Sequence, residues 1–155
     1  MKWKSVMAGV IGSMMGAMFG GCSAFQTMPE GKLLKLEYRR STMRSERQYE
    51  VQLTTEANGD VMLRAKKEPY GPLLQKKLTA EEVDGFVRII TEEKMYKYKE
   101  RYKPIFRVLD GYMWHFSAVF EQGKIYSSGD NATPSGEGLE KICEYAASLV
   151  CDSIP

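Results

Sequence analysis

The sequence predicts an α+β fold in which an antiparallel sheet of about five strands carries two helices on one face. Three observations predict it: segments in which apolar and polar residues alternate, turn signals that join such segments in pairs, and two stretches with apolar residues at helical spacing. Strands joined by short turns pair antiparallel, and helices cover the apolar face of a sheet. The predicted order is β-β-β-α-β-β-α, a two-layer sandwich.

Three strands are predicted before the first helix. Residues 34–38 and 49–55 each alternate apolar and polar side chains, which is typical of half-buried strands. The turn signal Asn-Gly-Asp at 58–60 leads into a third alternating segment at 61–66. Residues 49–66 are therefore predicted to form a β-hairpin.

The first helix is predicted from a capping box. Thr79 stands at the cap position and Glu82 follows three residues later. Apolar residues at helical spacing then continue to about residue 93. Gly85 lies inside this helix at a cost of about 1 kcal/mol relative to alanine, and a close helix-to-sheet contact would be a reason to keep it.

A second hairpin and a second helix complete the domain. Residues 112–121 carry apolar side chains on both faces, as in a central strand, and Gln122-Gly123 predicts a turn into a strand at 124–128. Thr133-Pro134 has the form of an N-cap followed by proline at the first helical position. Apolar residues then recur at helical spacing to Val150.

The net charge belongs to the N-terminal segment. The chain has 155 residues with 22 Lys+Arg against 20 Asp+Glu. Two of the basic residues, Lys2 and Lys4, lie in residues 1–21, which contain no acid, so the remaining chain is neutral. A neutral domain lacks the electrostatic footprint that bulk nucleic-acid binding needs, and nucleic acid is not an expected partner.

Residues 1–21 have the form of an export signal, with a basic start and no charge from residue 6 onward. This uncharged stretch is shorter than the roughly 20 residues of a membrane-spanning helix. Residues 19–22, Phe-Gly-Gly-Cys, resemble the lipobox of bacterial lipoproteins, with Phe19 where leucine is usual. The resemblance implies that Cys22 is diacylated and becomes the first mature residue. The alternative is an ordinary secretory signal in which Cys22 is incidental.

The same resemblance implies a location in the cell. A residue other than aspartate after the cysteine, here Ser23, is typical of enteric lipoproteins sent to the outer membrane of Gram-negative bacteria. Residues 22–31 are small and polar and are predicted to be a tether. A single domain is predicted over 32–155, held at the cell envelope by a lipid anchor.

The sequence contains no recognised catalytic or metal-binding motif. A single histidine excludes a multi-histidine metal site, so no cofactor and no metal are predicted and the protein is not expected to be an enzyme. His115 could serve a hydrolase only with Ser and Asp partners from elsewhere, and a half-buried strand histidine is the alternative. Cys143 and Cys151, if both helical, are about 12 Å apart, too far for a disulfide.

Residues 94–107 combine six basic residues and one acid with interleaved aromatic side chains. The candidate binding surface here consists of Tyr96, Lys97, Tyr98, Lys99, Arg101 and Tyr102. Such a composition suits base stacking, glycan stacking or attraction to anionic lipid headgroups. The alternative is a solvated helix end whose tyrosines pack on the domain. In an exported protein we expect a protein, glycan or membrane surface as the partner.

Residues 126–134 form a second candidate, a loop rich in oxygen atoms. Ser128, Asp130 and Asn131 are its candidate binding residues. The loop leads toward a predicted helix N-terminus, which favours anions, whereas one carboxylate is too few for calcium. The alternative is a connection whose side chains satisfy its own backbone.

The same region resembles the C-terminal half of small uncharacterised domains in lipoproteins of gut anaerobes. The residues that carry the resemblance are Asp110, Gly111, Trp114, Gly123, Lys124, Ser128, Gly129, Asn131 and Pro134. They are mostly turn and cap residues, so the resemblance implies a fold and no functional residues.

The sequence is therefore compatible with three alternative functions. The first is a non-enzymatic, lipid-anchored envelope protein that binds a partner protein or envelope component through residues 94–107. The second is a binding protein for a small molecule or glycan that uses residues 126–134 beside Trp114. The third is a hydrolase centred on His115.

Overall fold

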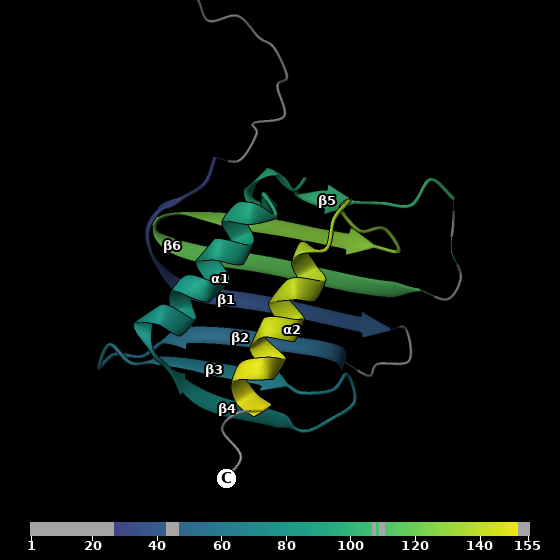
Figure 1. The fold of residues 1–155 in the computed structure, drawn as a ribbon. Coiled ribbons are helices and arrows are strands. Elements are labelled where there is room, and N and C mark those ends of the chain that lie inside the picture. Colours follow the sequence, from purple (N-terminus) through teal and green to yellow (C-terminus); the bar gives the residue numbers. More distant parts are fainter. Residues whose placement is uncertain (1–26, 43–46, 107, 109–110, 152–155) are drawn as a thin grey trace, which may run out of the picture.

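A computed structural model describes residues 27–42, 47–106, 108 and 111–151. The elements in chain order are β1 (Glu30–Thr42), β2 (Arg47–Thr55), β3 (Val61–Lys66), β4 (Leu73–Leu78), α1 (Ala80–Glu92), the 3-10 helix η1 (Met95–Lys97), β5 (Arg101–Tyr102), β6 (Tyr112–Asp130) and α2 (Gly138–Cys151). The six strands form one sheet in the order β4-β3-β2-β1-β6-β5, and both helices lie across one face of it (Figure 1). The predicted two-layer α+β fold is confirmed.

The chain of β6 turns back on itself, so the predicted second hairpin lies within one element. The backbone N–H of Asn131 donates to the carbonyl oxygen of Tyr112 at 2.9 Å, which brings the two ends of β6 together. Gly123 provides the reversal with a φ of +116°, a conformation that side chains other than glycine rarely adopt. The first arm of β6 pairs with β1 antiparallel, and the second arm pairs with β5 in parallel.

The predicted strand count and order need correction because β4 and β5 were missed. Leu74, Lys76 and Leu78 of β4 are the partly or fully covered positions, and a lysine at the middle one breaks the apolar alternation. Lys76 is tolerated there because its ammonium group lies 2.7 Å from the Glu82 carboxylate at the start of α1. β5 pairs over two residues, too short for any periodicity.

The capping box of α1 is confirmed. The Thr79 hydroxyl accepts from the backbone N–H of Glu82 at 3.3 Å, and the Glu82 carboxylate accepts from the N–H of Thr79 at 2.8 Å. Gly85 allows a close contact between α1 and α2, whereas a close contact between the helix and the sheet was predicted. A β-carbon there would lie 2.1 Å from the hydroxyl oxygen of Tyr145 on α2.

The predicted start of the second helix is wrong. α2 begins at Gly138, and its first hydrogen bond runs from the N–H of Lys141 to the carbonyl of Glu137 at 2.9 Å. Thr133-Pro134 does not cap it, because Gly136 at a φ of +107° redirects the chain before the helix starts. Pro134 is instead buried in the connection.

The core lies between the sheet and the helices. Leu36 of β1 pairs with Leu53 of β2, which pairs with Leu63 of β3, and all three are fully buried. On its other side Leu36 pairs with Ala118 of β6, which is also fully buried. These apolar rows explain why α1 and α2 cover this face. The alternate positions form the opposite sheet face, which neither helix covers (Figure 1).

Candidate functional site

In the segment after α1 the tyrosines pack inward and the cations are exposed, and one pair remains in contact: the Lys97 ammonium lies 5.8 Å from the centre of the Tyr96 ring. Tyr98 is buried, with 7% of its surface exposed, and burial raises its pKa to about 12. The Tyr102 ring lies 6.5 Å from that of Tyr98 and 5.8 Å from that of the buried Trp114, centre to centre. Tyr96 is half-buried. The tyrosines therefore pack on the domain, and Tyr98 is unavailable for stacking on a ligand.

The cations of the same segment face solvent. We call the exposed basic residues along η1 and β5 the basic edge: Lys94, Lys97, Lys99, Arg101 and Lys103. β5 is the last strand of the sheet, so the backbone that carries these residues runs along one sheet edge (Figure 1). Of the predicted candidate surface, Lys97, Lys99 and Arg101 are accessible and belong to this edge.

The second arm of β6 holds the basic edge in place. The backbone N–H of Ser128 donates to the carbonyl of Glu100 at 2.9 Å. The Ser127 hydroxyl, fully buried, donates to the carbonyl of Lys99 at 2.7 Å. These bonds fix the backbone that carries the cations, so the basic edge is part of the sheet and not a loose tail.

An apolar pair follows directly on the basic edge. Ile105 and Phe106 are 93% and 80% exposed. Nothing in the described part of the chain covers them, and exposure of this degree is unusual for two adjacent large apolar side chains. The pattern of residues 94–107 indicates Phe106 as one of the interleaved aromatic residues, but it gives no signal for Ile105.

The side chains of the candidate loop form hydrogen bonds within the domain, mostly to its backbone. The side-chain oxygen of Asn131 accepts from the N–H of Tyr112 at 2.8 Å, and its amide donates to the Asp130 carboxylate at 2.8 Å. The Ser128 hydroxyl donates to the carbonyl of Glu100 at 3.2 Å. Trp114 beside the loop is buried, and its indole N–H donates to the carbonyl of Ala132 at 2.7 Å. This geometry favours the structural interpretation of Ser128, Asp130 and Asn131.

His115 lies on the sheet face that the helices leave uncovered. It pairs with Arg39 across β1 and β6, and its ring centre lies 5.0 Å from that of Tyr126. Burial lowers the pKa of His115, and the nearby Glu37 carboxylate opposes that shift. The Glu37 carboxylate already forms an ion pair with Arg39, with 2.8 Å between Oε1 and Nε. Within the described residues no hydrogen bond joins the imidazole to a serine and a carboxylate, as a hydrolase would need.

The two described cysteines are both free, and both lie on α2. Burial raises the pKa of the Cys143 thiol to about 12, so it stays protonated at neutral pH and is a poor nucleophile.

The described residues contain no cluster of three or more His, Cys, Asp or Glu that could hold a metal ion. No described helix has the length and apolar character to cross a membrane. Residues 1–26 lie outside the described residues, and they include the predicted signal, Cys22 and the first half of the predicted tether.

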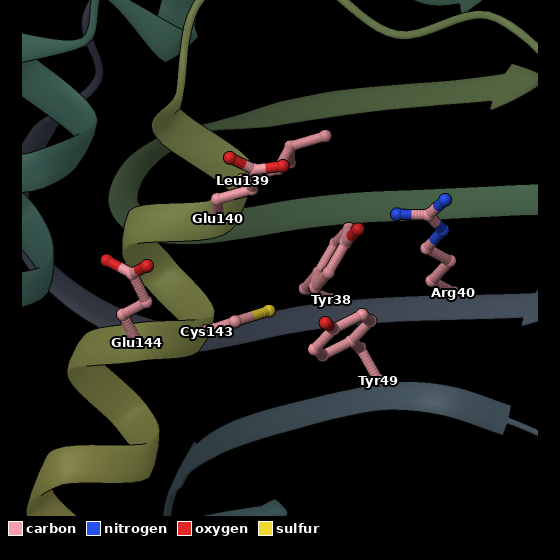
Figure 2. Close-up of a pocket in the computed structure, with 7 residues that line it drawn as sticks. All are labelled: Tyr38, Arg40, Tyr49, Leu139, Glu140, Cys143 and Glu144. Atoms are coloured by element: carbon pink, nitrogen blue, oxygen red, sulfur yellow. The ribbon is translucent and has the colours of Figure 1, made fainter. Parts of the chain in front are cut away.

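A small cavity between α2 and the sheet was not predicted. It has a volume of about 150 Å³ and lies where the first turns of α2 cross β1 and β2 (Figure 2). Its lining residues are Tyr38, Arg40, Tyr49, Leu139, Glu140, Cys143 and Glu144. A neighbouring cavity of about 190 Å³ shares Tyr49, Cys143 and Glu144 and extends along β2.

Side chains of opposite charge line this cavity. The Arg40 guanidinium lies 4.2 Å from the centre of the Tyr112 ring, and its buried Nε has no hydrogen-bond partner in the described part of the chain. The carboxylate of Glu140 comes from α2, on the other side of Tyr38 in Figure 2. A buried donor without a partner is costly, but this Nε is itself inaccessible, so a ligand oxygen would have to bind the outer nitrogens of the Arg40 guanidinium. Sequence reasoning missed the cavity because its walls come from segments about 100 residues apart.

No family model matches the chain, and comparisons with curated proteins and with solved structures found no significant match.

Proposed function

We propose that this chain is a non-enzymatic, lipid-anchored protein of the cell envelope that binds an envelope component through its basic edge. The lipobox-like residues 19–22 support the anchor at Cys22 and an address in the outer membrane of a Gram-negative bacterium. The partner is an acidic protein or another anionic component of the envelope. Nucleic acid is not proposed, because the chain after residue 21 is neutral.

The basic edge is the observation that carries the proposal. Five exposed cations stand along η1 and β5 with a single acid, Glu100, among them. Hydrogen bonds from Ser127 and Ser128 fix the backbone beneath them. A fixed row of like charges on a neutral domain gives a local positive potential, which steers an anionic partner to one surface.

Reversing three positive charges of the basic edge should abolish binding of the partner. We expect Lys97→Glu/Lys99→Glu/Arg101→Glu to lose the proteins or lipids that are captured with the wild-type chain after cross-linking in cells. Each side chain is exposed, so the fold should survive. The matched control is Arg64→Glu/Lys67→Glu/Arg88→Glu, which changes net charge equally at exposed positions away from the basic edge. Identical captured sets for all three proteins would refute the basic edge as a binding surface.

A second candidate function rests on the cavity at Arg40. The Arg40 guanidinium, with its unpartnered Nε among the described residues, and the Glu140 carboxylate share a space of about 150 Å³ with tyrosine side chains. A cavity of this size takes a ligand of only a few heavy atoms. A lining with one arginine and the glutamates Glu140 and Glu144 suits a small zwitterion, such as an α-amino acid with a short side chain, whose carboxylate would pair with Arg40 and whose ammonium group would pair with a glutamate.

Calorimetry with glycine, alanine and serine tests this second function. We expect saturable binding of at least one of them and a loss of roughly tenfold or more in affinity for Arg40→Met, because charge-assisted hydrogen bonds contribute about 1.5–3 kcal/mol. Glu137→Gln, an exposed change just before α2 and outside the cavity, serves as the control and should bind like wild type. Absence of binding by all three amino acids would rule out this ligand class.

A further inference from the structure

We infer that the basic edge and the apolar pair Ile105 and Phe106 together dock the domain onto an anionic lipid bilayer. The inference deepens the proposed function and rests on it, since it names the envelope component as the membrane that holds the anchor. It depends on how the apolar pair and the cations are placed relative to each other and to the start of the domain.

The apolar pair is held in solvent. Ile105 and Phe106 are 93% and 80% exposed, and they follow β5 closely in the chain. Two large apolar side chains held in water are unfavourable unless another apolar phase covers them. The acyl region just beneath the headgroups is such a phase, and aromatic and aliphatic side chains of membrane-binding surfaces lie there.

Positive charge accompanies that pair. Arg101 and Lys103 lie next to it in the chain, and Lys97 and Lys99 continue the row along the sheet edge. Each cation near an anionic membrane surface adds about fivefold to the binding constant. Apolar side chains flanked by cations fit a bilayer, where apolar tails lie beneath anionic headgroups. An acidic protein surface would match the cations but would leave Ile105 and Phe106 without an apolar partner.

The predicted anchor lies close to the domain in the chain. Met28 packs against the core, and Pro29 lies beside Gly123 at the turn of β6, the strand next to β5. From Cys22 to Thr27 the chain can span at most about 18 Å. An acylated Cys22 therefore keeps the turn of β6 close to the bilayer. The basic edge lies along the same edge of the sheet, where β5 pairs with Ser128 and Gly129 at the other end of the second arm of β6 (Figure 1).

Lipid quenching of a tryptophan introduced at position 106 tests the inference. The full chain carrying Phe106→Trp is expressed with its anchor and reconstituted into vesicles that contain brominated lipid. One vesicle set is phosphatidylcholine alone, and the other also contains phosphatidylglycerol. We expect quenching beyond that of the parent protein in the anionic vesicles, and much less in the neutral ones. Phe106→Trp should fold normally because the side chain is exposed.

Two variants control the measurement. Tyr70→Trp places the probe on another exposed aromatic position, in the connection between β3 and β4 at the far side of the sheet, and should not be quenched. Adding Lys97→Glu/Lys99→Glu/Arg101→Glu to Phe106→Trp should weaken docking by roughly 100-fold or more. Raised salt should release the probe in the same way, because it screens the headgroup charges.

Flotation of the same samples distinguishes failure of the lipid anchor from failure of the docking inference. If the protein floats with the vesicles and the probe at position 106 is not quenched, the anchor stands and the docking inference is wrong. If the protein neither floats nor is quenched, both the anchor and the docking are wrong. Equal quenching of the Phe106→Trp and Tyr70→Trp proteins would also overturn the inference, because it would mean that the domain has no preferred face toward the lipid.

Discussion

Cys22→Ser is expected to move the protein from the membrane fraction to the soluble fraction of the envelope after export. A serine hydroxyl cannot replace the thiol that the proposed diacylation needs, so the variant would lack the proposed lipid anchor. Several acyl chains hold a protein on a membrane far more firmly than one does. The basic edge alone should hold the variant weakly, so the cells are fractionated at low and at high salt.

Two controls make this result interpretable. Cys151→Ser changes a cysteine at the end of α2 and should stay in the membrane fraction. Cys22→Ser combined with Lys97→Glu/Lys99→Glu/Arg101→Glu should be soluble even at low salt. A Cys22→Ser protein that has lost residues 1–21 and still resists a high-salt wash would show that no lipid anchor at Cys22 is needed.

Gly129→Ala is expected to destabilise the domain by about 4 kcal/mol, because it combines overpacking with the loss of a buried hydrogen bond. A β-carbon at this position would lie 2.2 Å from the indole nitrogen of Trp114 and 2.3 Å from the carbonyl oxygen of Ala132. Those two atoms share a hydrogen bond of 2.7 Å. The added methyl group would therefore have to enter that bond, and Trp114 is too deeply buried to move aside at little cost.

Urea denaturation of both proteins measures the difference. Gly71→Ala is the matched control, since its nearest neighbour would be 3.4 Å away and no unusual φ is required. It should change the free energy of unfolding by less than about 1 kcal/mol. Because Trp114 contacts Tyr102, Gly129→Ala should also loosen β5 and with it the basic edge. A Gly129→Ala protein as stable as Gly71→Ala would contradict the packing described for Trp114.

Local patterns were enough to predict most of the fold. Alternating side chains identified β1, β2 and β3, and the capping box at Thr79 located the start of α1. The patterns failed where a tertiary contact replaces an apolar residue by a polar one. Lys76 faces the helix layer because Glu82 pairs with it. Thr133-Pro134 has the chemistry of a helix start, yet Gly136 redirects the chain there.

The binding surface could be predicted only in part, for a different reason. In residues 94–107 the sequence shows tyrosines and cations in one run, and no periodicity tells which of them point inward. The sheet edge decides it, because Tyr98 and Tyr102 pack toward Trp114 while the cations stay in water. The cavity at Arg40 could not be found in this way, since it forms only when β1, β2 and α2 meet.

The shortness of β5 has a consequence for self-association. An anchored protein is concentrated on a surface, where an open sheet edge can pair with the same edge of a second copy. β5 contributes only two paired residues, Arg101 and Tyr102, and the chain around it carries like charges that repel a second copy. The cations that we propose to attract lipid would thus also keep neighbouring domains from joining their sheets.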